Sequence, residues 1–185
     1  MATRVAPPIP DSIRLALVDH AELRDRLDAL HQESFGWALA CCRRDRTEAE
    51  DVLQTVYLQV LDGRARFDGR ASFKTWLFAV IRRTAASERR RSMMRRLLLE
   101  RQWKPESSVA ADVETRLDQD GRLERLTSAL RALAPRQHAV LELVFYHDLT
   151  IEDAATVMGV SLGTARTHYE RAKKRLATLL NGDLR

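Results

Sequence analysis

Apolar residues recur every three or four positions along most of the chain, which is the spacing of one face of an α-helix. The pattern is sharpest near the C-terminus, where two successive stripes are formed by Ile151, Ala154, Ala155 and Met158 and by Leu162, Ala165, Tyr169, Ala172, Leu176 and Leu180. The sequence has no strand-like alternation of apolar and polar residues and no segment that repeats at a fixed period. It therefore predicts an all-α protein.

The two C-terminal stripes are separated by residues that favour a tight turn. Thr150 is placed to cap the first helix, Gly159 to end it, and Ser161 to cap the second. Between Ser161 and Arg175 there are five lysines or arginines and one glutamate. A helix, a turn and a basic helix predict a helix-turn-helix that binds the major groove of DNA. The alternative is an ordinary amphipathic hairpin whose basic face is only solvated.

Helical patterns also fill the N-terminal part of the chain. Residues 12–44 carry apolar stripes, and Thr47 with Glu50 fits a capping box that begins the next helix. Ser72 is placed to cap a further helix, in which Trp76 is expected to be a core residue.

The net charge of +5 is unevenly distributed. Residues 63–104 contain 13 basic and 3 acidic side chains, a balance of +10, whereas residues 1–62 balance at −4 and residues 105–185 at −1. Together with the basic C-terminal helix, this gives two separate basic surfaces. Such a pattern is typical of a protein that contacts a polyanion at two places.

Breaks in periodicity divide the chain into two small helical domains. Residues 1–12 hold three of the five prolines and are expected to be disordered. Residues 13–103 form the first domain and residues 119–185 the second. Residues 104–118 are acidic and aperiodic, and they are expected to form a flexible linker.

Other function classes find little support in the residues. Cys41 and Cys42 are adjacent without a CxxC spacing, and we interpret them as small core residues. The five histidines have no metal-ligand spacing, so no metal and no cofactor are predicted. The sequence has no acidic metal cluster, nucleophile–base pair or glycine-rich phosphate loop, which argues against an enzyme such as a nuclease. It also lacks a long apolar run and a secretion signal, so a cytoplasmic location is expected.

Four segments, taken in order, resemble an extracytoplasmic-function (ECF) sigma factor, a small alternative promoter-specificity subunit of bacterial RNA polymerase. They are AEDVLQTVYLQVLD at 49–62, FDGRASFKTWLFAVIRR at 67–83, the acidic linker, and LRALAPRQHAVLELVFYHDLTIEDAATVMGVSLGTARTHYERAKKRL at 130–176. The resemblance covers residues 20–102 as region 2 and residues 119–181 as region 4. It implies a transcription initiation factor for a stress or envelope regulon, with no catalysis of its own.

The resemblance implies that the helix ending near residue 62 docks on a coiled coil of the largest polymerase subunit. The residues at the family's Glu-Asp-x-x-Gln positions are Glu50, Asp51 and Gln54. An acidic outer face suits a basic partner surface. By residue type alone, helix caps and a solvated face would explain these side chains better, and it is the order of the motifs along the chain that favours the docking role.

Region 2 is further implied to open the promoter's minus-ten element and to hold unpaired bases of the non-template strand. The residues that match this role are Phe67, Arg70, Lys74, Arg82 and Arg83. Arginines suit phosphates, and an extruded base needs a pocket and a stacking surface. Arg83 replaces an asparagine that is common in the family, so the usual minus-ten sequence is not inferred.

Region 4 is implied to bind the minus-thirty-five element as duplex DNA. Its candidate residues are Ser161, Thr164, Arg166, Thr167, Glu170, Arg171 and Lys174. Arg166 and Arg171 are the first choices for base contacts, because arginine to guanine is the commonest specific contact. Glu170 departs from the aromatic residue or histidine frequent in the family. The sequence does not decide whether its carboxylate accepts from cytosine or repels phosphate.

Three partners follow from the resemblance: core RNA polymerase, promoter DNA and an anti-sigma factor. The last would hold the chain inactive, in some cases at the inner membrane, while direct membrane insertion of this chain is not expected. The remaining alternative is a free-standing helix-turn-helix regulator that acts without polymerase. This alternative explains the C-terminal motif. It does not explain the helix at 49–62 or the basic segment 63–104, whose net charge is +10.

Overall fold

The computed structural model describes residues 11–102 and 121–181 of the chain. These residues form eight α-helices and no strand, so within them the all-α prediction is confirmed. In chain order the helices are α1 (Asp11–Ala29), α2 (His31–Cys41), α3 (Arg46–Leu61), α4 (Phe73–Gln102), α5 (Gly121–Arg131), α6 (Pro135–Phe145), α7 (Ile151–Met158) and α8 (Leu162–Asn181). The predicted linker at 104–118 lies outside the described residues. So do residues 1–10 of the predicted disordered N-terminus, whereas Asp11 and Ser12 already belong to α1.

The N-terminal bundle consists of α2, α3 and the first half of α4, with α1 packed on α2 and α3. Trp37 of α2 lies at its centre and is 1% exposed. Its ring stacks on that of Phe78 at a centroid distance of 6.0 Å, and its Nε1 donates to the Phe78 carbonyl at 3.0 Å. Val52 and Val56 of α3 are buried against the same cluster. Apolar stripes on three helices therefore meet in one core.

The start of α3 differs from the sequence prediction. The predicted capping box at Thr47 is wrong, because α3 begins at Arg46 and its N-cap is Asp45. The Asp45 carboxylate accepts from the Glu48 amide at 2.9 Å. A carboxylate caps as well as a hydroxyl and also interacts favourably with the positive end of the helix dipole.

Helices α7 and α8 form the predicted helix-turn-helix. The Asp153 amide donates to Thr150 Oγ1 at 3.0 Å, and the Thr164 amide donates to Ser161 Oγ at 3.2 Å. Gly159 ends α7 with a φ of +64°. All three helix-end predictions are confirmed. The turn depends on Gly159, because glycine adopts this backbone conformation without steric strain.

We expect Gly159→Ala to lower the free energy of unfolding by about 1 kcal/mol, measured by urea denaturation. The cost comes from the positive φ alone, since no atom lies within 4 Å of the added Cβ. Gly163→Ala is the matched control. Its Cβ would lie 4.0 Å from Ser161 Oγ inside a regular helix, so this change should stabilise by up to about 1 kcal/mol. Equal effects of the two changes would rule out a special backbone requirement at Gly159.

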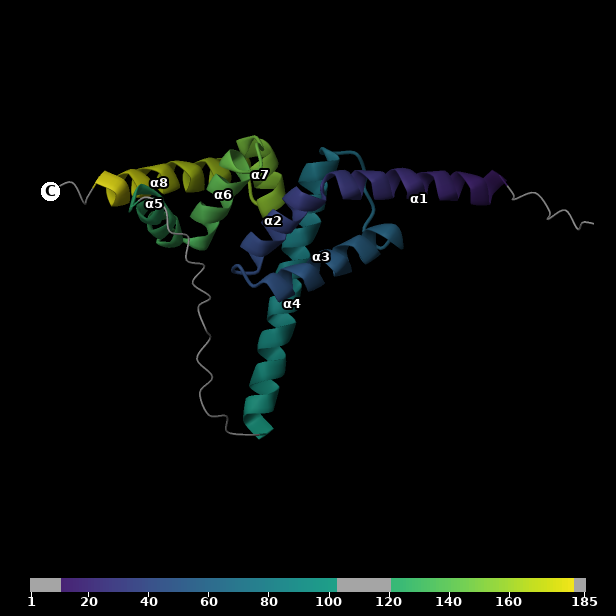
Figure 1. Ribbon diagram of the computed structural model, residues 1–185, viewed down its shortest axis with the longest axis horizontal. Helices are drawn as coiled ribbons and strands as arrows, with labels where there is room; N and C mark the ends of the chain where they lie inside the picture. The colour runs from purple at the N-terminus through teal and green to yellow at the C-terminus, as the bar shows by residue number, and fades with distance from the viewer. Residues whose placement is uncertain (1–10, 103–120, 182–185) are drawn as a thin grey trace, which may run out of the picture.

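The N-terminal and C-terminal halves are packed against each other and share one core. Figure 1 shows α7 beside the upper part of α4, and these two helices are in direct contact. Val140 and Leu143 of α6 and Val157 of α7 belong to the same buried cluster as Trp37 and Phe78. The two predicted domains therefore meet in a continuous apolar interface.

The adjacent cysteines are part of the packing at the end of α2. Cys42 is buried, and Cys41 is half-buried against the core cluster. Burial raises the pKa of both thiols to about 12. Such thiols carry no thiolate at neutral pH, which agrees with the prediction of small core residues.

Candidate nucleic-acid interface

A polar pocket of about 390 Å³ opens beside the first half of α4. The residues that line it come from the end of α3, the following loop and one face of α4: Gln59, Arg64, Ala65, Arg66, Trp76, Val80, Arg83, Thr84, Ser87, Glu88 and Arg91. Four of these are arginines and one is a glutamate, whose carboxylate is already paired with Arg91 Nη1 at 2.6 Å. A pocket with cationic edges and an aromatic wall can hold a base together with its phosphates.

The aromatic wall of this pocket is fixed from behind. The Trp76 ring packs on Phe73 and Phe67, at centroid distances of 5.3 and 5.5 Å. The guanidinium of Arg26 in α1 covers Phe73 at 4.2 Å from the ring centroid. Trp76 is therefore half-buried: one part packs on the core, as predicted, and another part lines the pocket.

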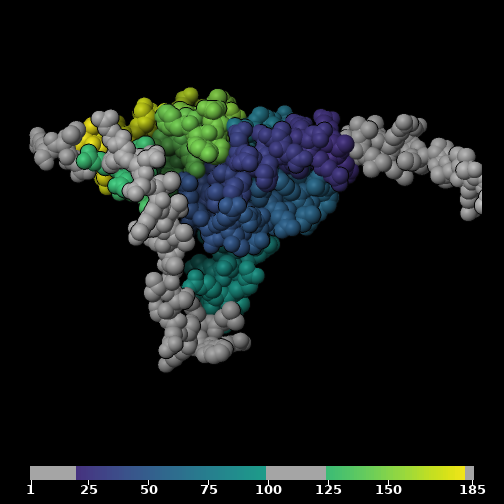
Figure 2. Space-filling model, in the orientation of Figure 1, coloured from purple at the N-terminus to yellow at the C-terminus, as the bar shows by residue number. Residues whose placement is uncertain are grey.

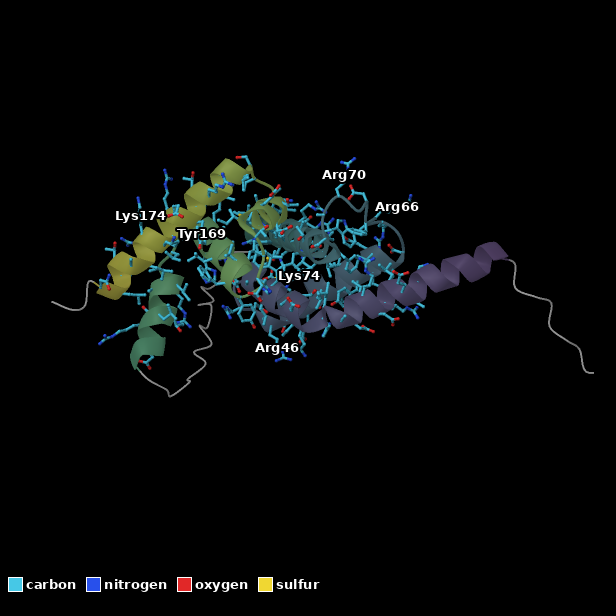
Figure 3. The ribbon with its side chains drawn as sticks, turned by 90° about the horizontal axis from the view of Figure 1, so that it is seen from above. Arg46, Arg66, Arg70, Lys74, Tyr169 and Lys174 are labelled. Carbon is cyan, nitrogen blue, oxygen red and sulfur yellow. The ribbon has the colours of Figure 1, made fainter. Side chains whose placement is uncertain are left out.

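Three of the predicted minus-ten residues lie in or near the pocket. Arg83 lines it directly and is exposed. Phe67 lies behind the wall in the aromatic cluster, not on the open surface of the loop. Arg70 stands on the exposed loop and pairs with Asp68, with 3.3 Å between Nε and Oδ2. Figure 3 shows Arg70 at the same edge of the molecule as the pocket residue Arg66.

The other two predicted minus-ten residues face the C-terminal half of the protein. Lys74 Nζ donates to the His147 carbonyl at 2.7 Å and pairs with the Glu33 carboxylate. Arg82 Nη1 donates to the Met158 carbonyl at 3.4 Å, and burial lowers the pKa of this guanidinium. Both cations are therefore engaged within the protein in this arrangement.

A third polar contact joins the halves beside Lys74. The Thr75 amide donates to Ser72 Oγ at 3.1 Å, which confirms the predicted cap of α4. Thr75 Oγ1 in turn donates to Asp153 Oδ1 at 3.0 Å across the interface. Asp153 also accepts from the Thr150 hydroxyl at 2.6 Å. The first turns of α4 and α7 thus share one carboxylate.

His147 places an imidazole at the centre of the interface, 1% exposed. Its ring lies edge-on to Phe78 at 4.8 Å and to Trp37 at 5.9 Å. Neither ring nitrogen has a hydrogen-bond partner among the described residues. The pKa of His147 is lowered, and burial is the largest cause. The charge of Lys74 also lowers this pKa, whereas three carboxylates act in the opposite direction: Glu142, Glu33 and Asp148. The interface therefore favours the neutral ring.

We expect acidification to weaken the packing of the two halves. Because the packed arrangement lowers the pKa of His147 below its ordinary value of about 6.5, the unpacked chain takes up the proton first. The stabilisation is complete above about pH 6.5 and is lost as the pH falls through the lowered pKa. The melting temperature, followed by circular dichroism between about pH 7.5 and 5.5, should fall more steeply for the wild type than for His147→Phe.

His20→Asn is the control for this titration, because His20 is exposed on α1. It should keep the wild-type pH dependence. A His147→Phe chain that also kept it would show that another group is responsible.

An apolar groove of about 630 Å³ runs along α2 and α3. Glu50 and Gln54 line it, and Asp51 is exposed three residues before Gln54, so all three predicted polymerase-binding residues lie on one side of α3. Glu50 Oε1 pairs with Arg46 Nε at 2.9 Å in an exposed contact. The apolar lining is formed by Phe35, Leu53, Tyr57, Leu58 and Leu61.

Three of the predicted minus-thirty-five residues have hydroxyls that serve α8 itself. Ser161 Oγ caps the helix and lies 2.9 Å from Thr164 Oγ1. Thr167 Oγ1 donates back to the Gly163 carbonyl at 2.9 Å. Ser161 and Thr164 thus keep the N-terminal end of the predicted recognition helix in place.

The remaining predicted minus-thirty-five residues are exposed along α8: Arg166, Glu170, Arg171 and Lys174. Figure 3 labels Lys174 on this helix, far from the loop that carries Arg66. Glu170 Oε1 lies 3.7 Å from Lys173 Nζ, so a neighbouring cation partly compensates its charge.

Gln59, Arg64 and Arg66 were not predicted as site residues. In this segment the resemblance implied only Phe67 and Arg70, whereas the pocket also uses the first part of the loop and the end of α3. A usable signal was present, because GRARF at 63–67 carries two arginines directly after a helix.

In the parts of the chain that the structure describes, no group of three or more histidine, cysteine or carboxylate residues is arranged to hold a metal ion. The described helices include none with the length and apolar character to cross a membrane. What the described residues offer is a pocket, a groove and an exposed basic helix, which are binding surfaces.

Comparison with known proteins assigns both halves of the chain to conserved regions of sigma factors. The family described as Sigma-70 region 2 matches residues 28–95, and Sigma-70, region 4 matches residues 123–176. The ECF RNA polymerase sigma factor SigC of Mycobacterium tuberculosis is 30% identical over 140 residues, covering 76% of this chain and 74% of SigC. The RNA polymerase sigma-E factor of Streptomyces avermitilis is 31% identical over 159 residues, covering 83% of this chain and 80% of that factor. Among solved structures, the sigma factor RpoE in complex with the anti-sigma factor NepR from Bartonella quintana has the same fold, with a TM-score of 0.64 at 24% identity over 86% of this chain and 97% of RpoE.

Proposed function

Because this chain belongs to the ECF sigma factors, which direct promoter-specific transcription by bacterial RNA polymerase, we propose that its two basic surfaces divide promoter recognition between them. The observation that carries the proposal is the arginine-lined pocket beside α4, which has a fixed aromatic wall and lies apart from α8. The chain is a transcription initiation factor and not an enzyme.

In this proposal the pocket holds an unpaired base of the minus-ten element. The Trp76 ring offers a stacking surface, and the guanidinium groups of Arg66 and Arg83 neutralise the flanking phosphates. The Arg64 guanidinium pairs with Asp62 at 2.6 Å and would exchange that carboxylate for a phosphate. Phe67 supports the wall from behind, and Arg70 extends the cationic edge along the loop. These roles explain why the aromatic residues are packed and the arginines are exposed.

Helix α8 is proposed to enter the major groove at the minus-thirty-five element. Arg166 and Arg171 would contact base edges, while Lys174 would contact phosphate. The Ser161 end of the helix would approach the DNA backbone, where a helix N-terminus favours phosphate. Glu170 is held near Lys173, and it would need to leave that cation to accept from a base.

The groove along α2 and α3 is proposed to receive the polymerase. Leu58 and Leu61 provide the apolar contact, and Glu50 and Gln54 provide the polar edge, with the exposed Asp51 beside them on α3. A coiled coil that presents apolar and basic side chains would complement this surface.

We further propose that the two halves separate before the promoter is bound. Lys74 and Arg82 cannot reach DNA while they contact Glu33, His147 and Met158. An anti-sigma factor in the cytoplasm, free or anchored at the inner membrane, is the proposed partner that opposes this separation. Support comes from RpoE, whose structure was solved with the anti-sigma factor NepR.

Asp51→Arg tests the polymerase-binding assignment. We expect the affinity for core polymerase to fall about tenfold or more, because a like charge then faces the basic partner. The control is Asp25→Arg on α1, which also reverses an exposed carboxylate. Run-off transcription with core enzyme, on the promoter upstream of the chain's own gene, should be lost in the first variant and kept in the second. If Asp51→Arg bound core polymerase with unchanged affinity, α3 would not be part of the polymerase interface.

A free-standing regulator is disfavoured, because the region 2 match assigns the N-terminal half to sigma factors. The same experiment separates the two functions. Tight promoter binding without core polymerase, and no gain in transcription when core is present, would favour the free-standing regulator.

A further inference from the structure

The second half of α4 carries an exposed apolar stripe that the functions above do not use, although Arg91 beside it also lines the pocket described above. Figures 1 and 2 show it extending below the rest of the described molecule. Every residue from Arg89 to Leu98 is exposed, whereas the preceding part of the helix carries the core residues Phe78, Ile81 and Ala85. A helix segment without tertiary packing is only marginally stable by itself, so a surface of this kind gains stability from a partner.

The exposed segment carries a continuous apolar stripe. Its four side chains are between 48% and 62% exposed: Met93, Met94, Leu97 and Leu98. They form two pairs four residues apart, which places them side by side on one face of the helix. Methionine and leucine in this pattern are typical of a seam that packs against another helix.

Arginines border the stripe along both edges. From the helical rotation of about 100° per residue, Arg89 and Arg96 lie along one edge and Arg91 and Arg95 along the other, while Arg90 lies in line with the stripe at its N-terminal end. The stretch from Arg89 to Leu98 contains five arginines and no acidic residue. Within the described residues, Arg91 is the one arginine of these five that pairs with a carboxylate, that of Glu88.

We propose that this half of α4 is a docking surface for an acidic amphipathic helix of a second protein. The partner's apolar ridge would cover Met93, Met94, Leu97 and Leu98, and its flanking carboxylates would pair with the arginines at the edges. A second copy of this chain is disfavoured, because symmetric packing would place the same five arginines against each other. DNA is disfavoured because phosphates leave the four apolar side chains uncovered.

The partner helix makes contact over about three turns, so a dissociation constant in the micromolar range is expected. The probe is a synthetic peptide of about four heptads, with leucine along its seam and glutamate along both edges. A matched peptide carries lysine at the glutamate positions. Binding to the full-length chain is measured by fluorescence anisotropy of each labelled peptide.

The glutamate peptide should bind, and the lysine peptide should bind about tenfold more weakly or not at all. Met94→Ser with Leu98→Ser should weaken binding of the glutamate peptide about tenfold. Arg95→Gln with Arg96→Gln should weaken it and reduce its dependence on salt. All four residues are exposed, and circular dichroism verifies that both variants fold.

Several results would overturn the proposal. Equal binding of the two peptides would leave no role for the arginines. Loss of binding in Leu58→Ser would place the peptide in the groove along α2 and α3 instead. Binding to phosphatidylserine vesicles without binding to the peptide would indicate a membrane surface. Peptide binding that appears only after the carboxylates of residues 104–118 are replaced by amides would show that the chain's own linker is the occupant.

Discussion

Replacing Arg83 by glutamate is expected to reduce run-off transcription about tenfold to a hundredfold while leaving the affinity for core polymerase unchanged. Arg83 lines the pocket together with the loop arginines, so the reversed charge would repel a phosphate from the position where the unpaired strand is proposed to lie. The residue is exposed, and the folded chain should tolerate the change. The effect should therefore appear in promoter opening, which permanganate footprinting detects as unpaired thymines.

Arg24→Glu on α1 is the control, because it makes the same charge change at an exposed site outside the pocket. A promoter with a preformed bubble adds a second test. If Arg83 assists strand separation alone, the bubble restores transcription. If Arg83 holds the extruded strand itself, the defect remains. Full activity of Arg83→Glu on the duplex promoter would show that the pocket does not bind the minus-ten element.

Trp37→Ala is expected to lower the free energy of unfolding by about 3–5 kcal/mol. Trp37 is almost fully buried, stacks on Phe78 and lies edge-on to His147, so the deletion leaves a cavity where the two halves meet. A loss of this size is a large fraction of the stability of an ordinary domain. Urea denaturation measures it, and Leu58→Ala, at an exposed position, should change the stability by less than about 0.5 kcal/mol.

The shared core predicts a second effect of Trp37→Ala, on the hydrogen exchange of both halves. Hydrogen exchange should increase in α6 and α7 as well as in α2 and α4, because Leu143 and Val157 pack in the cluster that contains Trp37. Retained protection in α6 and α7, with loss confined to α2 and α4, would show that the halves unfold as separate units.

Local signals in the sequence were sufficient for the helix-turn-helix. Thr150, Gly159 and Ser161 act on backbone groups within three or four residues of themselves, so their roles can be inferred without knowledge of the tertiary fold. The wrong N-cap predicted for α3 also depends only on neighbouring residues. Asp45 and Thr47 are both competent caps, and the pattern alone did not distinguish them.

The contacts between the halves could not be predicted in the same way. Lys74 and His147 are 73 residues apart, and an isolated lysine at a helix start looks like a free cation. Periodicity shows that a face is apolar but not which other face covers it. The resemblance implies DNA contacts for Lys74 and Arg82, and it gives no sign that their partners in this arrangement are Glu33 and two backbone carbonyls.

The apolar interface between the halves affects how long the chain survives in a cell. Any state in which the halves have parted brings Phe78, Leu143 and Val157 toward water, and such surfaces are what chaperones and proteases bind. If the halves separate as proposed, a chain that meets no polymerase would be a substrate for degradation, and its steady-state level should rise with the supply of core enzyme.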